Sequence, residues 1–94
     1  MKLSIFTIRR TIYEGETTRV TLPTAVGEVT ILDHHEPYVT ILKSGNLRYE
    51  VPVRSELPQS GAKSASRMEE KNFPIKGGFL EVREGNEVRV LADE

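Results

Sequence analysis

The strict alternation of apolar and polar positions is the feature that most constrains the fold of this chain. Its longest run covers residues 47–54, where Leu47, Tyr49, Val51 and Val53 alternate with charged residues and a proline. A period of two residues predicts a β-strand with one buried and one exposed face. Pro52 cannot donate a backbone hydrogen bond, so we expect an edge strand or a bulge near that position.

Shorter apolar runs of the same kind recur along the chain, and no stretch of ten residues shows helical periodicity. The first of them covers about residues 2–8 and carries apolar side chains on both faces. About eight or nine short strands with regularly spaced turn signals predict an all-β fold, either an antiparallel β-sandwich or a flattened barrel.

Several glycines and prolines divide these strands. We expect a turn at Tyr13–Glu16, the end of a strand at Pro23 and a turn at Gly77–Gly78. Gly85–Asn86 is typical of a tight hairpin turn. Residues 55–71 are polar and contain almost no large apolar side chains, so we predict an exposed, mobile insertion in a hairpin there.

Length and composition limit the classes of protein that fit. The 94 residues predict a single domain over residues 1–94, and the absence of cysteine excludes a disulfide framework. Thirteen basic and fourteen acidic residues are mixed along the chain without a basic stripe, so we expect no nucleic-acid partner. The apolar runs are far shorter than the roughly 20 residues of a membrane helix, and Met1 leads into a strand instead of a signal peptide. We therefore expect a soluble chain.

One cluster could be read as a site for chemistry. The loop Asp33–Glu36 holds both histidines between two carboxylates, and imidazole and carboxylate groups are zinc and iron ligands. Adjacent side chains of an extended loop point to opposite sides, so we predict a solvated turn and no metal. A free-standing β-sandwich that binds a small ligand or metal through this loop is the alternative. The sequence shows neither a serine, histidine and acid trio nor a phosphate-binding loop, so we expect no enzyme and no cofactor.

Longer motifs carry a resemblance to a known family. In chain order they are YEGETTRVTLP (13–23), LPTAVGEVTIL (22–32), HEP (35–37), VTILKSGNLR (39–48) and GGFLEVREGNEVRVLAD (77–93). Together these stretches resemble the ε subunit of F-type ATP synthases. The resemblance implies a β-sandwich of about ten strands. It also implies a non-catalytic rotor subunit of the central stalk in a proton-translocating synthase, peripheral to the cytoplasmic face of a bacterial plasma membrane.

The resemblance further implies two partners, the γ subunit and the c-ring. It places Glu28 and His35 on the ring-facing surface, and we expect these two residues to lie close together at one end of the sandwich. Five residues form the predicted γ-facing set: Phe6, Ile8, Tyr38, Thr40 and Phe79.

The last residues carry an expectation of their own. In long relatives a sequence like VLAD is followed by two helices, whereas here VLADE (90–94) is the end of the chain. We therefore expect a form without those helices that neither binds ATP nor inhibits hydrolysis.

Overall fold

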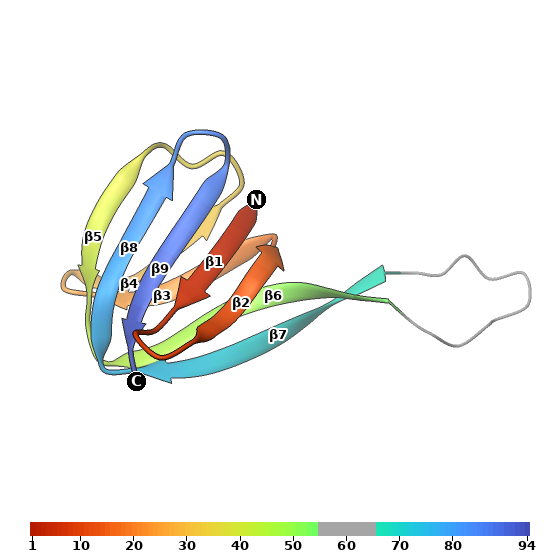
Figure 1. Ribbon diagram of the computed structural model, residues 1–94. Coiled ribbons are helices and arrows are strands. Elements are labelled where there is room, and N and C mark those ends of the chain that lie inside the picture. Colours follow the sequence, from red (N-terminus) through yellow and green to blue (C-terminus); the bar gives the residue numbers. More distant parts are fainter. Residues whose placement is uncertain (55–65) are drawn as a thin grey trace, which may run out of the picture.

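A computed structural model describes residues 1–54 and 66–94 of the chain. Nine β-strands account for most of these residues, and the described part contains no helix (Figure 1). They are β1 (Lys2–Phe6), β2 (Thr11–Glu16), β3 (Arg19–Thr24), β4 (Gly27–Leu32), β5 (Tyr38–Leu42), β6 (Gly45–Arg54), β7 (Ser66–Ile75), β8 (Gly77–Arg83) and β9 (Glu87–Asp93).

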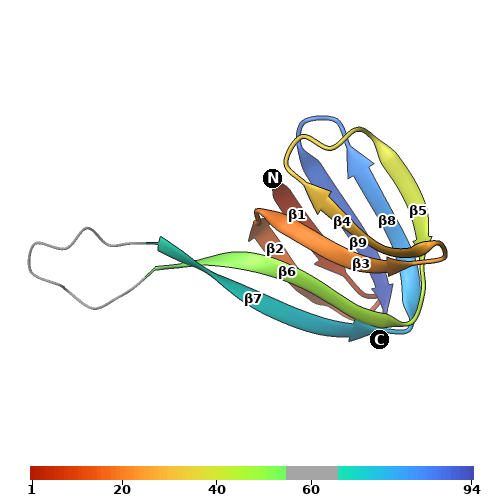
Figure 2. The ribbon, with the colours of Figure 1, turned by 180° about the vertical axis from the view of Figure 1, so that it is seen from behind.

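The strands form one sheet that curls over on itself. Its order is β2-β1-β9-β8-β5-β3-β6-β7, with β4 paired to β3. Figure 1 looks onto the layer that contains β1, β9, β8 and β5, and Figure 2, seen from the other side, shows β3 and β4 in front of that layer. All pairings are antiparallel except that of β1 with β9. The predicted all-β class is confirmed, with nine strands in the described residues instead of about ten.

The interior between the two layers holds the side chains that alternation assigned to it. On β6 the buried faces of Leu47, Tyr49 and Val51 confirm the period of two. The largest fully buried side chains come from β1, β3, β4, β6, β8 and β9: Leu3, Ile5, Val20, Leu22, Ile31, Leu47, Leu80, Val88 and Val90. Removing such apolar surface from water is the main term that stabilises the fold.

The turn predicted at Tyr13–Glu16 is wrong, because these residues lie in β2. Gly15 does not supply a positive φ here; it leaves room for the Tyr13 ring, whose hydroxyl would lie 2.9 Å from a Cβ at that position. The Tyr13 hydroxyl donates a hydrogen bond of 2.6 Å to the carbonyl oxygen of Glu16. The chain reverses earlier, where the Thr7 hydroxyl accepts hydrogen bonds from the backbone N–H groups of Arg9 and Arg10.

Pro23 also differs from expectation, since β3 continues through it to Thr24. Its carbonyl oxygen accepts a hydrogen bond from the N–H of Lys43, and the ladder to β4 tolerates the missing donor. Gly85 and Asn86 have φ of 83° and 58°, which confirms the predicted hairpin turn between β8 and β9.

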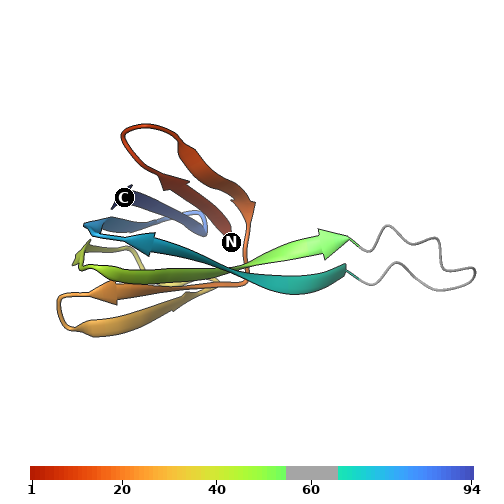
Figure 3. The same cartoon turned by 90° about the horizontal axis from the view of Figure 1, so that it is seen from below.

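The predicted insertion falls mainly outside the described residues, which stop at Arg54 and resume at Ser66. From Ser66 onward the chain is not a loop but the start of β7, paired with β6 in unbroken register. The outer parts of β6 and β7 project beyond the two layers as a two-stranded ribbon (Figure 3). Polar residues suit such a ribbon because little of it can be buried, and this is why alternation did not reveal the strand.

Within residues 1–54 and 66–94, no helix has the length and apolarity needed to cross a membrane.

Candidate functional site

Glu28 and His35, the two residues predicted to face the c-ring, lie at opposite ends of β4. Glu28 is the second residue of the strand, and its Oε1 accepts a hydrogen bond of 2.6 Å from Arg48 on β6. His35 follows the strand by three residues, and its Nδ1 lies 2.7 Å from the carbonyl oxygen of Glu36. A strand rises about 3.3 Å per residue, so Glu28 is already about 13 Å from Leu32. The expectation that the two residues lie close together is wrong, because turns that flank one strand lie at its two ends.

The histidine loop is held by the turn between β8 and β9. His34 adopts a positive φ of 61°, and its N–H donates a hydrogen bond of 2.7 Å to Oδ1 of Asn86. The side-chain amide of Asn86 donates in turn to Oδ1 of Asp33 at 3.3 Å. In the part of the chain that the structure describes, three possible metal-ligating side chains do not gather anywhere. The polar groups of Asp33 and His34 act in local hydrogen bonding.

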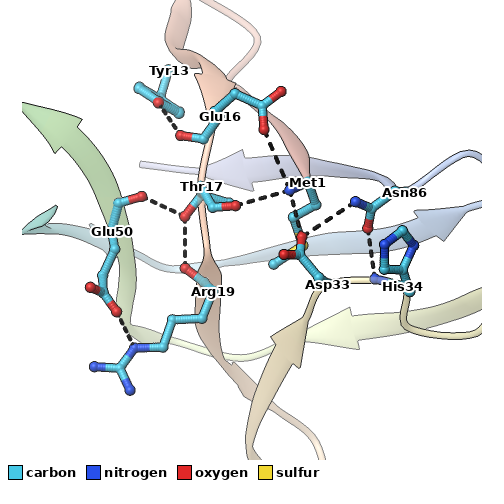
Figure 4. A network of polar contacts seen from close by, with 9 residues as sticks. All are labelled: Met1, Tyr13, Glu16, Thr17, Arg19, Asp33, His34, Glu50 and Asn86. Atoms are coloured by element: carbon cyan, nitrogen blue, oxygen red, sulfur yellow. Dashed lines mark hydrogen bonds and ion pairs between the residues drawn. The ribbon is translucent and has the colours of Figure 1, made fainter. Parts of the chain in front are cut away.

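Asp33 also anchors the start of the chain (Figure 4). The ammonium group of Met1 lies 2.6 Å from Oδ1 of Asp33 and 3.4 Å from Oε2 of Glu16, and it donates to the carbonyl oxygen of Thr17 at 3.1 Å. Burial lowers the pKa of this ammonium, but the hydrogen bonds and charges of Asp33 and Glu16 together outweigh it, so the net shift is upward. Hydrogen bonds from the ammonium and from Asn86 lower the pKa of Asp33.

A continuous apolar row crosses the outer face of the sheet. Ile41 on β5 is paired with Phe79 on β8, Phe79 with Leu91 on β9, and Leu91 with Phe6 on β1. Side chains of directly paired residues lie on the same face of a sheet. Ile41, Phe79 and Leu91 are 61%, 54% and 50% exposed. A hollow of about 270 Å³ lies beside Phe6, Phe79 and Leu91. We call Phe6, Ile41, Phe79 and Leu91 the apolar row.

Two further rows continue this face toward the turn between β8 and β9. Val39, 68% exposed, is paired with Glu81, and Glu81 with Arg89. The next pair is Arg83 with Glu87, whose side chains form an ion pair of 3.2 Å. The outer face therefore changes from apolar to charged along the strands. Contiguous exposed apolar side chains rimmed by charge are typical of a protein-docking surface.

The predicted γ-facing set is divided by the structure. Phe6 and Phe79 belong to the apolar row, but Tyr38 and Thr40 lie on the opposite face, paired with residues of β8 that are buried. Ile8 is exposed in the reversal beyond β1.

Three members of the exposed face were missed, namely Val39, Ile41 and Leu91. On β5 nearly every residue is apolar, so alternation did not distinguish its two faces. The pairing register could have identified them. If Phe79 lies on the outer face of the sheet, the residues directly paired with it, Ile41 and Leu91, must lie on the outer face as well.

A curled sheet with one buried face and a row of exposed apolar side chains on the other belongs to the β-sandwich class. The family model described as "ATP synthase, Delta/Epsilon chain, beta-sandwich domain" matches residues 1–94. The chain belongs to this family.

Curated relatives carry the name ATP synthase epsilon chain. The protein of Dehalococcoides mccartyi is 36% identical over 93 residues, which cover 99% of this chain and 55% of the relative. The chloroplastic protein of Chlamydomonas reinhardtii is 33% identical over 94 residues, which cover 100% of this chain and 60% of the relative. The chain thus spans little more than half the length of these relatives.

Solved structures with a similar fold belong to ATP synthases. A chain of the Euglena gracilis mitochondrial ATP synthase structure, which covers OSCP, F1 and the c-ring, is 25% identical with a TM-score of 0.72. That match covers 98% of this chain and 49% of the other. A chain from the central stalk and c-ring of the Tetrahymena thermophila mitochondrial enzyme has a TM-score of 0.70 at 16% identity, covering 100% of this chain and 63% of that one, which supports the fold alone.

Proposed function

We propose that this chain is a non-catalytic central-stalk subunit of a proton-translocating F-type ATP synthase, where it joins the γ subunit to the c-ring. Membership of the delta/epsilon family supports this role, and so do the names of the relatives. The observation that carries the proposal is the exposed apolar row on the outer face of β1, β9, β8 and β5. In this role the chain is peripheral to the membrane and lies on its cytoplasmic face.

The γ contact of the proposal is the apolar row, together with Val39. Burying exposed Phe79 and Leu91 against a partner removes apolar surface from water and adds binding energy. Tyr38 and Thr40 are not part of the proposed γ contact, because their side chains share the face of the sheet that packs on the core.

The ring contact of the proposal is the turn before β4 together with Glu28, the second residue of that strand. Val26 in this turn is 86% exposed, and the Glu28 carboxylate next to it is held by Arg48. An exposed apolar tip beside an oriented charge suits a contact that fixes register more than it adds affinity. The ring-facing role of His35 stays a separate prediction, because this residue lies at the other end of β4.

Co-purification with γ and the c-ring tests the proposal. Tagged chain should retain γ, and Phe79→Lys should reduce that retention at least about tenfold, since it places a charge in an apolar contact. Met68→Lys is the matched control, because Met68 is an exposed apolar residue on β7, away from the row. A chain that retains neither γ nor the c-ring would support the alternative, a free-standing ligand-binding module.

The ring contact is tested separately by coupling in reconstituted membranes. Glu28→Lys should lower ATP-driven proton pumping without loss of γ, while His35→Lys reports on the other end of β4. Unchanged pumping with Glu28→Lys contradicts the ring contact and leaves the γ contact untouched.

A further inference from the structure

The outer face of β8 and β9 is complementary to itself. We propose that two copies of this chain associate through it, around a two-fold axis that runs along the strands between β8 and β9. This inference goes beyond the proposed function, because its occupant is a second copy and not another subunit of the synthase.

The register of the hairpin carries the inference. A two-fold axis between β8 and β9 places each residue of β8 over its own pairing partner in the second copy. Phe79 is paired with Leu91, so each Phe79 meets Leu91 of the second copy. The same operation places Ile41 over Phe6 at the two ends of the apolar row, because these residues flank the hairpin on β5 and β1. Apolar side chains therefore meet apolar side chains along the whole row.

The charged rows obey the same symmetry. Glu81 is paired with Arg89, and Arg83 with Glu87, so each of these four charges meets the opposite charge of the second copy, while Asp93 meets its own pairing partner Gly77. Within the described residues Glu81 forms no ion pair of its own. Arg89 forms only a long ion pair, with its Nε 3.7 Å from Oε1 of Glu87. Both groups are available for contact across the axis. Closed dimers of this kind need such a self-complementary patch.

The size of the outer face of β8 and β9 determines how tightly the two copies should associate. The four strands span about 14 Å, and a sheet that curls around its core bends away from its outer face, so contact concentrates on β8 and β9. An interface of this extent lies at the low end of specific ones, and we expect a weak, reversible dimer. Because the face is also the proposed γ contact, the second copy and γ exclude each other.

Sedimentation equilibrium of the isolated chain from about 10 to 500 μM tests the inference. The unaltered chain should show a monomer–dimer equilibrium. Glu81→Arg and Arg89→Glu should each raise the dimer Kd at least about tenfold, because each sets like charges against one another. An equimolar mixture of the two variants should associate as a heterodimer with a Kd within about threefold of the original value, because opposite charges then face each other again.

Glu70→Arg is the charge-reversal control, since Glu70 is an exposed residue of β7, which lies far from β8 and β9 in the strand order. Thermal melts monitored by circular dichroism show whether each variant is folded. A chain that stays monomeric throughout the range overturns the inference, as does a mixture of the two variants that fails to associate. Neither result touches the proposed function, which is decided by retention of γ and the c-ring.

Discussion

Among the glycines that the structure describes, Gly78 has the least room for a side chain. Its φ is +138°, and a Cβ atom there would overlap the carbonyl oxygen of Leu91 and lie 2.9 Å from Cα of Ala92. The close approach of β8 to β9 at this point depends on the missing side chain. Gly27 also has a positive φ, of 117°, but no atom lies within 4 Å of its Cβ position.

The comparison of these two glycines gives a prediction. Gly78→Ala should lower the free energy of unfolding by more than about 3 kcal/mol, because it combines backbone strain with overlap in the ladder. Gly27→Ala should cost only about 1 kcal/mol, since it adds strain alone. Urea denaturation of both variants measures the difference. Equal losses would show that the approach of β9 to Gly78 does not limit the side chain.

The ion pair between the Met1 ammonium and Asp33 should make stability depend on pH. The pKa of Asp33 is lowered, so its contribution is complete above about pH 4 and is lost as the pH falls through the folded-state value. The net pKa of the ammonium is raised, so its contribution is complete below about pH 8 and is lost as the pH rises through the folded-state value. The pair therefore stabilises the fold between these limits.

Asp33→Asn tests this pH dependence. Its melting temperature should fall below that of the unaltered chain at pH 6, and the two should converge as the pH falls through the folded-state pKa of Asp33, which is lowered. Glu36→Gln, a change of charge in the same loop, should leave the profile unchanged. A constant difference across the whole range would contradict the ion-pair account, since a neutral structural defect does not titrate.

At the scale of elements, the turn between β8 and β9 joins two parts of the fold. Asn86 has a positive φ, its side chain bonds His34 and Asp33, and its carbonyl oxygen accepts a hydrogen bond from Lys2. One residue thus fixes the hairpin, the histidine loop and the start of β1.

Substitution at this turn separates the two contributions of Asn86. Asn86→Gly keeps the positive φ but removes the amide, and it should cost about 1 kcal/mol of unfolding free energy. Asn86→Ala loses both and should cost about 2–3 kcal/mol. Hydrogen exchange should show faster opening of residues 33–37 in both variants. Protection of that loop equal to the unaltered chain would mean that it is held by other contacts.

The same elements show what the sequence could and could not predict. Alternation on β6 and the glycine–asparagine turn were sufficient because each depends on local geometry alone. Gly15 was misread because its small size serves a tyrosine ring that only the tertiary fold brings over it. The outer face of β5 depends on its pairing with β8, since both of its faces carry apolar side chains. The apolar row is therefore a property of register and not of any single strand.

At the scale of the whole molecule, β1 and β9 lie side by side and bring residues from the two ends of the sequence together. Their parallel pairing joins the first and last strands of the chain, and both contribute to the core and to the outer face. A β-sheet that buries one face and docks with the other needs adjacent residues to serve different purposes. Stability and association should then be separable at neighbouring positions of one strand.

Leu80 and Phe79 give the sharpest test of this separation. Leu80 is fully buried, so Leu80→Ala should lower the free energy of unfolding by about 2–5 kcal/mol through lost burial and a new cavity. Phe79→Ala removes a larger side chain but should cost less than about 1 kcal/mol, because the ring is already half in water. Its effect should appear in association instead, as weaker retention of γ and a higher dimer Kd. Chemical denaturation and binding measured on both variants decide the point: a Phe79→Ala variant as unstable as Leu80→Ala would place the ring in the core and remove the basis for a docking face.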